Sequence, residues 1–288
     1  MTRVSLPFPV LDALPSGAHR LIALTDEALF EASGVHIMFT GRAGGVSEGP
    51  YASLNTASHV GDDSAAVEQN RRRVLEITGA SHAELIVLNQ VHGTDLVQVE
   101  EELDIADAVQ RGRDGADGIV VGTAGVAALL NFADCLPVIV VSPSGRFAVA
   151  HAGWRGAVAG IAGKAARSLA EGDSFPASEF NAYIGPHIRT ECFEVGEDVA
   201  SRFVQAFGPE VVEGSRHVSL AHAVSCDLTR AGLDPQRIAD ASICTKCHAD
   251  EYFSYRATGG TCGRHAAFAV RLDNGDGGCC QPEEPQVY

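Results

Sequence analysis

Residues 126–156 read VAALLNFADCLPVIVVSPSGRFAVAHAGWRG, and this stretch decides the fold. Its apolar runs, at 126–132, 138–141 and 147–150, are short and rich in valine, isoleucine and leucine. Runs of this length, separated by Pro, Ser and Gly, are typical of buried strands. A helix of mostly small residues is predicted directly after them, over 155–169. The stretch therefore predicts strands and helices packed in one α/β or α+β domain.

The rest of the chain continues this alternation of strands and helices. Further strands are predicted at 36–40, 85–89, 95–99, 119–121, 182–184 and 266–272, and helices at 65–78 (with Ser64 as N-cap), 196–207 and 220–232. We expect a single catalytic domain over 1–272, built as a layered mixed sheet flanked by helices. A tail rich in Gly, Cys and Pro, over 273–288, is expected to be irregular.

Composition excludes several classes of function. The 288 residues carry a formal net charge of −16, which argues against a general nucleic-acid binder. No segment has the length of a membrane span, and the N-terminus does not have the pattern of a signal peptide. We therefore expect a cytoplasmic protein whose eight cysteines are free, metal-binding or catalytic. Its expected partners are small molecules, with no obligate protein partner inferred.

Three short segments each contribute one metal-type ligand from a loop-like setting. They are residues 89–93 (NQVHG), 133–137 (ADCLP) and 150–156 (AHAGWRG), and their ligands are His92, Cys135 and His151. Two imidazoles and one thiolate suit zinc and leave the fourth position open, as in catalytic sites. Cys135 and His151 each follow a predicted strand, so the two side chains converge if those strands are neighbours. A surface histidine and a buried thiol would give the same spacing, so the pattern alone leaves both interpretations open.

Neighbouring residues add candidates for catalysis and anion binding. Asp134 is a candidate general base or a partner for an imidazole, or a plain carboxylate at a strand end. The loop 41–47 (GRAGGVS) places Arg42 and Ser47 among glycines, a set that can hold phosphate, although a plain turn explains it equally well. His187 follows the strand 182–184 and either lines the same cavity or caps a loop.

The remaining cysteines leave several alternatives. Residues 244–248 (CTKCH) match the pattern of covalent haem attachment, which we reject because no export signal is present. A redox pair, or a second structural metal site, is an alternative for the cysteines at 247, 262, 279 and 280.

With these residues in place, the chain resembles the multicopper polyphenol oxidase, or laccase-domain, family, which is also described as zinc-dependent purine nucleoside phosphorylases. The resemblance runs in order from about Gly41 to Arg271. Its segments are 41–47, 53–55, 59–62, 70–71, 90–93, 114–118, 133–135, 151–156, 185–186, 192–195, 253–256 and 263–264. Cys247 and Cys262 interrupt the last of these motifs, so the edge of that region is a departure from the family pattern.

The resemblance implies a fold like that of bacterial toxin deamidases of the cysteine-hydrolase type. It also implies zinc held by His92, Cys135 and His151, with phosphorolysis of adenosine, inosine, guanosine and S-methyl-5'-thioadenosine and a second activity in adenosine deamination. On this basis the predicted catalytic residues are Cys135, Asp134 and Arg42, and the predicted substrate and phosphate ligands are Arg42, Ser47, Asn55, His187 and Arg264.

The name laccase fits the sequence poorly. Multicopper oxidases hold their copper through His-x-His pairs, and none of the eleven histidines forms one. Copper could still occupy the zinc site, because Cu²⁺ binds N and S ligands more tightly than zinc, so copper-dependent phenol oxidation is one alternative function. Another is an amidase that edits peptidoglycan precursors, with Cys135 as nucleophile beside His151. A third is a non-catalytic protein that zinc stabilises and that binds a partner.

Overall fold

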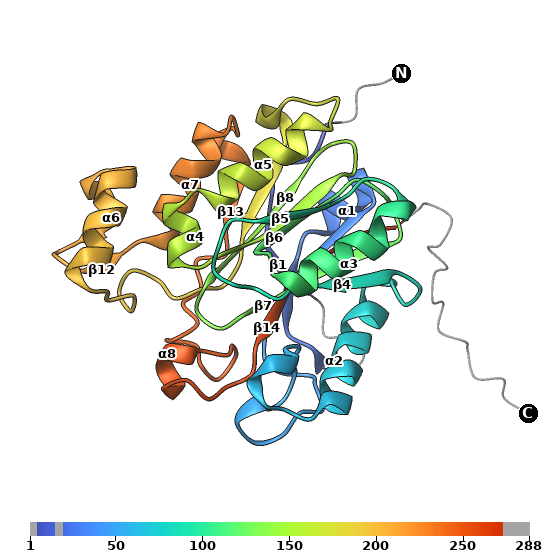
Figure 1. Ribbon diagram of the computed structural model, residues 1–288, viewed down its shortest axis with the longest axis horizontal. Coiled ribbons are helices and arrows are strands. Elements are labelled where there is room, and N and C mark those ends of the chain that lie inside the picture. The colour runs from blue at the N-terminus through green and yellow to red at the C-terminus, as the bar shows by residue number, and fades with distance from the viewer. Residues whose placement is uncertain (1–4, 15–19, 273–288) are drawn as a thin grey trace, which may run out of the picture.

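Two six-stranded sheets, packed face to face, form the centre of the computed structural model, which describes residues 5–14 and 20–272 (Figure 1). The first sheet has the order β1-β2-β3-β14-β7-β4 and the second β13-β10-β8-β9-β6-β5. The strands of the first are β1 (Asp12–Ala13), β2 (Ala23–Thr25), β3 (Val35–Thr40), β4 (Glu84–Val87), β7 (Val126–Phe132) and β14 (His265–Arg271). Those of the second are β5 (Leu96–Val99), β6 (Gly118–Val121), β8 (Leu136–Val141), β9 (Phe147–Ala152), β10 (Asn181–Ile184) and β13 (Ile238–Asp240). A separate pair is β11 (Val212–Glu213) with β12 (His217–Val218).

The expectation of a single mixed sheet is therefore wrong, because the structure has two large sheets, although each of them is mixed. β4 runs parallel to β7, and β5 runs parallel to β6, while the central pairs of both sheets are antiparallel. The sequence did not reveal two sheets because their central strands are buried on both faces. In β7, Ala128 and Leu130 face the second sheet while Ala127 and Leu129 face the opposite side, and all four are buried. A strand buried on both faces has no polar face to show which sheet it joins.

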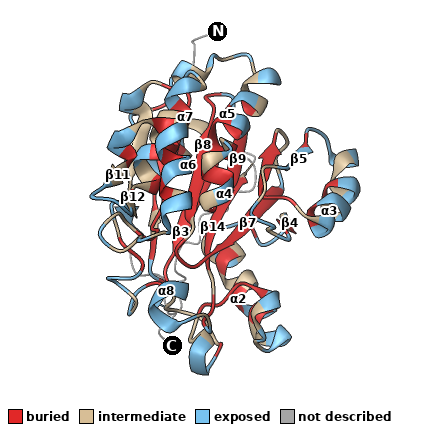
Figure 2. Cartoon of the chain, turned by 60° about the vertical axis from the view of Figure 1, so that its left-hand side comes forward, coloured by how far each residue is buried: buried red, intermediate tan, exposed pale blue. Residues whose placement is uncertain are grey.

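Helices cover the two outer faces of this sandwich. The helices are α1 (Glu27–Ser33), α2 (Ser64–Ile77), α3 (Ile105–Asp114), α4 (Trp154–Val158), α5 (Ile161–Glu171), α6 (Glu197–Phe207), α7 (Leu220–Arg230) and α8 (Tyr255–Thr258). α4 and α5 pack on the second sheet, α6 and α7 join the same apolar cluster and contact α4, and α2 packs on the first sheet. The buried strands form the interior, and each of these helices turns an exposed face to solvent (Figure 2). The result is a single-domain α+β fold of four layers.

Most predicted elements match observed ones within two residues at each end, but two details are wrong. The helix predicted over 155–169 is two helices, because Gly160 separates α4 from α5 with a left-handed φ of 78°. The N-cap of α2 is Asp63, whose side chain accepts a hydrogen bond from the Ala66 amide, and Ser64 is the first helical residue. Either carboxylate or hydroxyl serves as an N-cap, so sequence alone does not choose between neighbours.

Two further predictions concern the C-terminal tail and membrane-spanning segments. The tail at 273–288 lies outside the described residues, so its boundary and its irregular structure stay predictions. Within the described part of the chain, no helix combines the length and apolarity that a bilayer span requires.

Candidate metal centre

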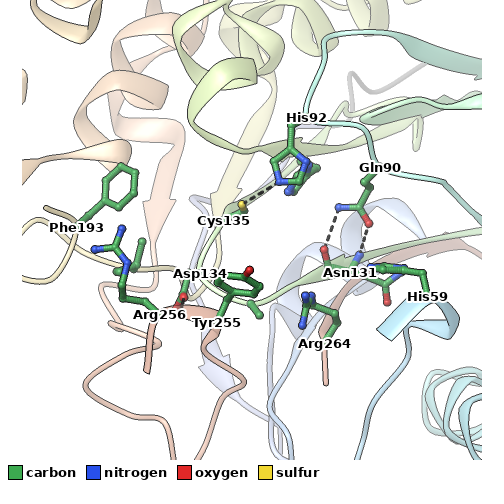
Figure 3. Close-up of a pocket in the computed structure, with 13 residues that line it drawn as sticks. His59, Gln90, His92, Asn131, Asp134, Cys135, Phe193, Tyr255, Arg256 and Arg264 are labelled. Atoms are coloured by element: carbon green, nitrogen blue, oxygen red, sulfur yellow. Dashed lines mark hydrogen bonds between the residues drawn. The ribbon is translucent and has the colours of Figure 1, made fainter. Parts of the chain in front are cut away.

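The three predicted ligands converge. The side chains of His92, Cys135 and His151 offer ligand atoms that all lie within 4.8 Å of one another. The Nε2 atom of His92 is 3.8 Å from the Cys135 Sγ atom, and the two imidazole rings meet edge to face at 4.8 Å between centroids (Figure 3).

The crossing of the chain between the two sheets places Cys135. β7 ends at Phe132 in the first sheet and β8 begins at Leu136 in the second, so residues 133–135 make the crossing. β8 pairs with β9, with Pro137 opposite His151. The predicted strand that precedes Cys135 is β7, but the strand paired with β9 at His151 is β8. His151 itself lies within β9 and does not follow it.

Asp117 connects the other two ligands, and sequence reasoning gave it no role of its own. Its buried carboxylate lies 2.7 Å from His151 Nδ1, which leaves Nε2 of that ring as the ligand atom. The same carboxylate accepts hydrogen bonds from the amides of Val91, His92 and Gly93. His92 has a φ of 61°, a conformation that three accepted amides help to hold. A carboxylate behind a histidine ligand is the usual partner at metal sites, and that requirement is the signal that could have found Asp117.

Close packing of the two imidazoles requires a glycine beside them. A Cβ atom on Gly153 would lie 2.7 Å from Cδ2 of His92 and 3.4 Å from Cε1 of His151. Any larger residue would push the His92 ring out of place. The glycine in the 150–156 segment is therefore part of the site.

The electrostatics favour a thiolate at Cys135. Burial raises the pKa of this thiol, but the His151 and His92 rings outweigh burial and lower the pKa to about 6. Burial disfavours the His151 cation in turn, while Cys135 and Asp117 raise the pKa of His151 to about 9. A thiolate is the form that binds a metal or attacks a carbon atom.

The donor set fits zinc in kind and in size. Zinc takes imidazole nitrogen at about 2.0–2.1 Å and thiolate sulfur at about 2.3 Å, which places N and S ~3.6 Å apart in a tetrahedron. The observed separation between His92 Nε2 and Cys135 Sγ is 3.8 Å. Copper accepts the same donors, so the geometry supports a metal site without choosing between the two ions.

A cavity of about 410 Å³ opens in front of the three ligands. Its lining consists of His59, Gln90, His92, Asn131, Ala133, Asp134, Cys135, His151, Ile188, Phe193, Tyr255, Arg256 and Arg264. Figure 3 shows Phe193 and Arg256 on one side of the ligands and His59 with Arg264 on the other. The volume lies within the range of small-molecule sites, about 300–1,000 Å³.

Cationic groups give one side of the cavity a positive character. Burial lowers the pKa of His59, and the nearby Arg264 and Arg71 lower it further. Arg264 donates from Nη1 to the carbonyl groups of Cys262 and Gly263, which fixes its guanidinium at 5.8 Å from the centre of the Tyr255 ring. A fixed guanidinium at a cavity wall is suited to an anion such as phosphate.

Asp134 lines the cavity but its carboxylate also tethers two segments. One oxygen accepts from the Thr245 hydroxyl and the other from the Arg256 amide, each at 2.6 Å. Asp134 has a φ of 89°, and these contacts hold it in that conformation. A role in proton transfer stays a prediction, and the contacts seen are those of a tether at the first turn of α8.

Four predicted substrate residues lie outside the cavity lining given above. Arg42 donates to the carbonyl groups of Ala52 and Ala249, and the Ser47 hydroxyl accepts from Asn70. The Asn55 side chain accepts from the Arg264 amide, so it acts on the cavity by positioning Arg264. His187 is buried, with Nδ1 2.9 Å from the Gly185 carbonyl. Their predicted binding roles stay predictions, whereas Arg264 does line the cavity.

Gln90, Asn131, His59, Phe193, Tyr255 and Arg256 also line the cavity, and the sequence gave them no role. The Gln90 side chain exchanges two hydrogen bonds with the backbone of Asn131, which ties the segment carrying His92 to β7. All but Asn131 lie in motifs that carry the family resemblance, which was the available signal.

An α+β sandwich with an open His–Cys–His site in a cavity of small-molecule size defines a class of candidate metalloenzyme. The chain belongs to the family described as multi-copper polyphenol oxidoreductase laccase, whose model matches residues 36–272. This confirms the family inferred from the motifs.

Known relatives carry names from purine metabolism. The purine nucleoside phosphorylase YlmD of Geobacillus stearothermophilus is 36% identical over 81% of this chain and 89% of its own. A purine nucleoside phosphorylase of Streptomyces coelicolor is 37% identical over 84% and 97%. A protein of an unknown prokaryotic organism, named adenosine deaminase RL5, is 31% identical over 80% and 92%.

Solved structures agree with the fold. The crystal structure of the Geobacillus stearothermophilus YlmD matches with a TM-score of 0.76 at 34% identity, over 84% of this chain and 93% of that one. The Bacillus licheniformis hypothetical protein YfiH matches with a TM-score of 0.79 at 27% identity, over 91% and 99%. The expected likeness to toxin-type cysteine hydrolases stays a prediction.

Proposed function

We propose that the chain is a zinc-dependent purine nucleoside phosphorylase that acts on adenosine, inosine, guanosine and S-methyl-5'-thioadenosine, with adenosine deamination as a second activity. The observation that carries the proposal is the convergence of His92, Cys135 and His151 on a cavity that also presents a fixed guanidinium, that of Arg264. Relatives that cover most of this chain are named purine nucleoside phosphorylases, and one is named an adenosine deaminase.

The lining offers a place for each part of the substrates. Phe193 and Tyr255 present aromatic rings that suit the face of a purine. Arg264, beside His59, suits the phosphate that attacks the anomeric carbon of the sugar. When the glycosidic bond breaks, its electron pair passes to the purine, which must be protonated or otherwise neutralised. Zinc, when bound to His92, Cys135 and His151, would supply a Lewis acid at this place.

A product assay tests the proposal. Zinc-loaded protein is incubated with adenosine, with and without phosphate, and adenine, ribose-1-phosphate and inosine are separated. We expect adenine and ribose-1-phosphate only with phosphate present. Inosine should form in both reactions, and with phosphate part of it should be converted to hypoxanthine, because inosine is itself a proposed substrate. Cys135→Ala should lose both metal and turnover. Absence of adenine and inosine from the wild-type reactions contradicts the proposal.

A second assay tests the phosphate site. Arg264→Gln should raise the KM for phosphate more than it lowers kcat, because it removes an anion contact that is made before the reaction begins. The matched control is Arg111→Gln, an exposed arginine of α3. Equal phosphate KM values for Arg264→Gln and wild type would show that Arg264 does not bind phosphate. They would not contradict the proposed type of reaction.

One observation favours a second candidate function. Cys135 and His151 lie within ligand distance of each other, the pKa of the thiol is lowered and that of the imidazole is raised, and such a pair is also what a cysteine amidase needs. Iodoacetamide distinguishes the two candidates when Cys135 is followed by peptide mass spectrometry. A zinc ligand is protected until a chelator is added, whereas a free nucleophile is alkylated at once in zinc-treated protein.

A further inference from the structure

A second group of metal-type ligands lies apart from the His–Cys–His centre. It consists of Glu191, Cys192, Cys244 and Cys247, whose ligand atoms all lie within 4.8 Å of one another. Cys244 is buried, while Cys247 and Glu191 are exposed. The Sγ atoms of Cys192 and Cys247 are 3.4 Å apart. Sequence reasoning had grouped Cys247 with Cys262, but Cys262 instead packs against Ala133 and Phe253.

The fold brings two segments together at this place. His187 and Cys244 form a parallel bridge, in which the His187 amide donates to Ile243 and the Thr245 amide donates to His187. Each segment then turns back on itself. The Cys192 amide donates to the Arg189 carbonyl, and the His248 amide donates to the Cys244 carbonyl. These turns bring the thiols of Cys192, Cys244 and Cys247 close together.

A disulfide would use only part of this arrangement. Bonding Cys192 to Cys247 would leave the buried Cys244 thiol and the Glu191 carboxylate without a role. A tetrahedral zinc ion uses all four groups, and its thiolates lie ~3.8 Å apart because each Zn–S bond is about 2.3 Å. The observed separation of 3.4 Å between Cys192 and Cys247 is near that value.

We propose that Cys192, Cys244, Cys247 and Glu191 form a second, structural Zn²⁺ site. Four protein ligands leave no open position, which is the pattern of structural rather than catalytic zinc. Soft thiolates favour zinc over magnesium or calcium at such a place. This proposal does not depend on catalysis at the His–Cys–His centre, so it is independent of the proposed nucleoside chemistry.

The second site adjoins the wall of the cavity through its neighbours in sequence. Phe193, directly after Cys192, lines the cavity, and Thr245, directly after Cys244, donates to Asp134. Arg256 adds a third link, because its guanidinium donates to the carbonyl of Glu194 while its amide donates to Asp134. Zinc at the second site would therefore hold this wall in place, and its loss should loosen the cavity without removing the catalytic ligands.

Counting bound zinc tests the inference. The experiment uses the full chain in a Cys279→Ser, Cys280→Ser background, because those two thiols lie outside the described residues and could add to the count. Protein loaded with ZnCl₂ and desalted is measured by mass spectrometry of the metal. We expect two zinc ions per chain, one in Cys247→Ala, one in Cys135→Ala, and none in the double variant. Cys226→Ala, at a half-buried cysteine outside both groups, should retain two.

Cobalt substitution identifies the ligands. The thiolate-to-cobalt absorption of the second site should be about threefold that of the first, since three thiolates replace one. Glu191→Gln should weaken zinc binding at the second site at least about tenfold, because even partners behind the ligands are worth about 10–100-fold.

Three results would overturn the inference. They are a single zinc per chain that Cys135→Ala abolishes, two zinc ions that survive in Cys247→Ala, and a Cys192–Cys247 disulfide in peptides of protein kept under reducing agent. An unchanged affinity in Glu191→Gln would overturn the assignment of the fourth ligand. Because every readout is a metal count, a metal affinity, an absorption or a peptide mass, failure here is distinguishable from failure of the phosphorylase assay.

Discussion

At the scale of single residues, Asp117 links His151 with the loop that carries His92. Its carboxylate receives three backbone amides and faces one imidazole nitrogen. An asparagine at this position has one acceptor oxygen and one donor group, so it cannot serve all four partners. Asp117 therefore positions two of the three candidate metal ligands.

Asp117→Asn should weaken metal binding at the His–Cys–His centre by about 10–100-fold, the usual cost of losing a partner behind a histidine ligand. The measurement is competition with a chromogenic chelator in a Cys247→Ala, Cys279→Ser, Cys280→Ser background, which leaves one expected site. Asp114→Asn, three residues earlier and exposed, is the matched control. Equal zinc affinity with and without Asp117→Asn in this background would show that the contacts of Asp117 do not support the ligands.

The residue scale also shows where sequence reasoning succeeds and fails. His92, Cys135 and His151 were predictable as candidates because two imidazoles and one thiolate suit a metal, although the sequence left a surface histidine and a buried thiol as an equal interpretation. Their convergence is visible only in the structure. Arg42 and Ser47 had the right chemistry too, but their side chains bond within the fold. Whether a polar side chain faces a cavity or a backbone carbonyl depends on contacts that sequence does not display.

At the scale of elements, the division between α4 and α5 follows from one glycine. Gly160 takes a left-handed φ of 78°, and its amide closes the end of α4 on the Ala157 carbonyl. The run of small residues around it predicted one continuous helix, since alanine favours helix strongly and no proline intervenes. A glycine inside a helix and a glycine that ends one look alike in sequence.

Gly160→Ala should lower the free energy of unfolding by about 1–2 kcal/mol, because an L-residue pays that much in the left-handed region. An added Cβ would also lie 3.1 Å from the Asp227 carboxylate of α7. Urea unfolding followed by circular dichroism measures the loss. Gly160→Asn serves as the graded control, since asparagine adopts this conformation more readily than alanine. Wild-type stability in Gly160→Ala would mean that the left-handed turn is not required.

The first residue of β14, His265, gives this strand a sensitivity to acid. Burial and the neighbouring Arg264 lower the pKa of His265 to about 3, from the usual histidine value of 6.5. Between these values the unfolded chain binds a proton that the folded chain does not. Stability is therefore complete above the unfolded pKa and falls as the pH drops toward the folded pKa.

In wild type this histidine should remove about 1.4 kcal/mol of stability for each pH unit below 6.5. His265→Leu should lose that slope, so its unfolding free energy should fall less steeply than that of wild type between pH 6 and pH 4. Urea titrations at several pH values measure the two slopes. His82→Leu, at an exposed position, should keep the wild-type slope. Parallel curves for wild type and His265→Leu would contradict the prediction.

At the scale of the whole molecule, the candidate metal centre lies where the chain passes between the two sheets. His92 falls between β4 of the first sheet and β5 of the second, and Cys135 falls between β7 and β8. His151 belongs to β9 of the second sheet. Sequence predicted most of these strands but not their division into two sheets, because strands buried on both faces lack the alternation that would distinguish partners. The ligands converge because the segments that carry His92 and Cys135 both cross from one sheet to the other.

A metal at this place would join both sheets, so its removal should lower the stability of the whole domain. A ligand at 100 times its Kd stabilises the folded state by about 2.7 kcal/mol. At about 2–4 °C per kcal/mol for a chain of this size, chelation should lower the Tm by about 5–10 °C. Differential scanning calorimetry measures the shift in the Cys247→Ala, Cys279→Ser, Cys280→Ser background, so that the His–Cys–His centre alone responds. Cys135→Ala in the same background should melt at one temperature with or without zinc. If chelation leaves the Tm of the Cys135-containing protein unchanged, the three ligands do not hold a metal that connects the sheets.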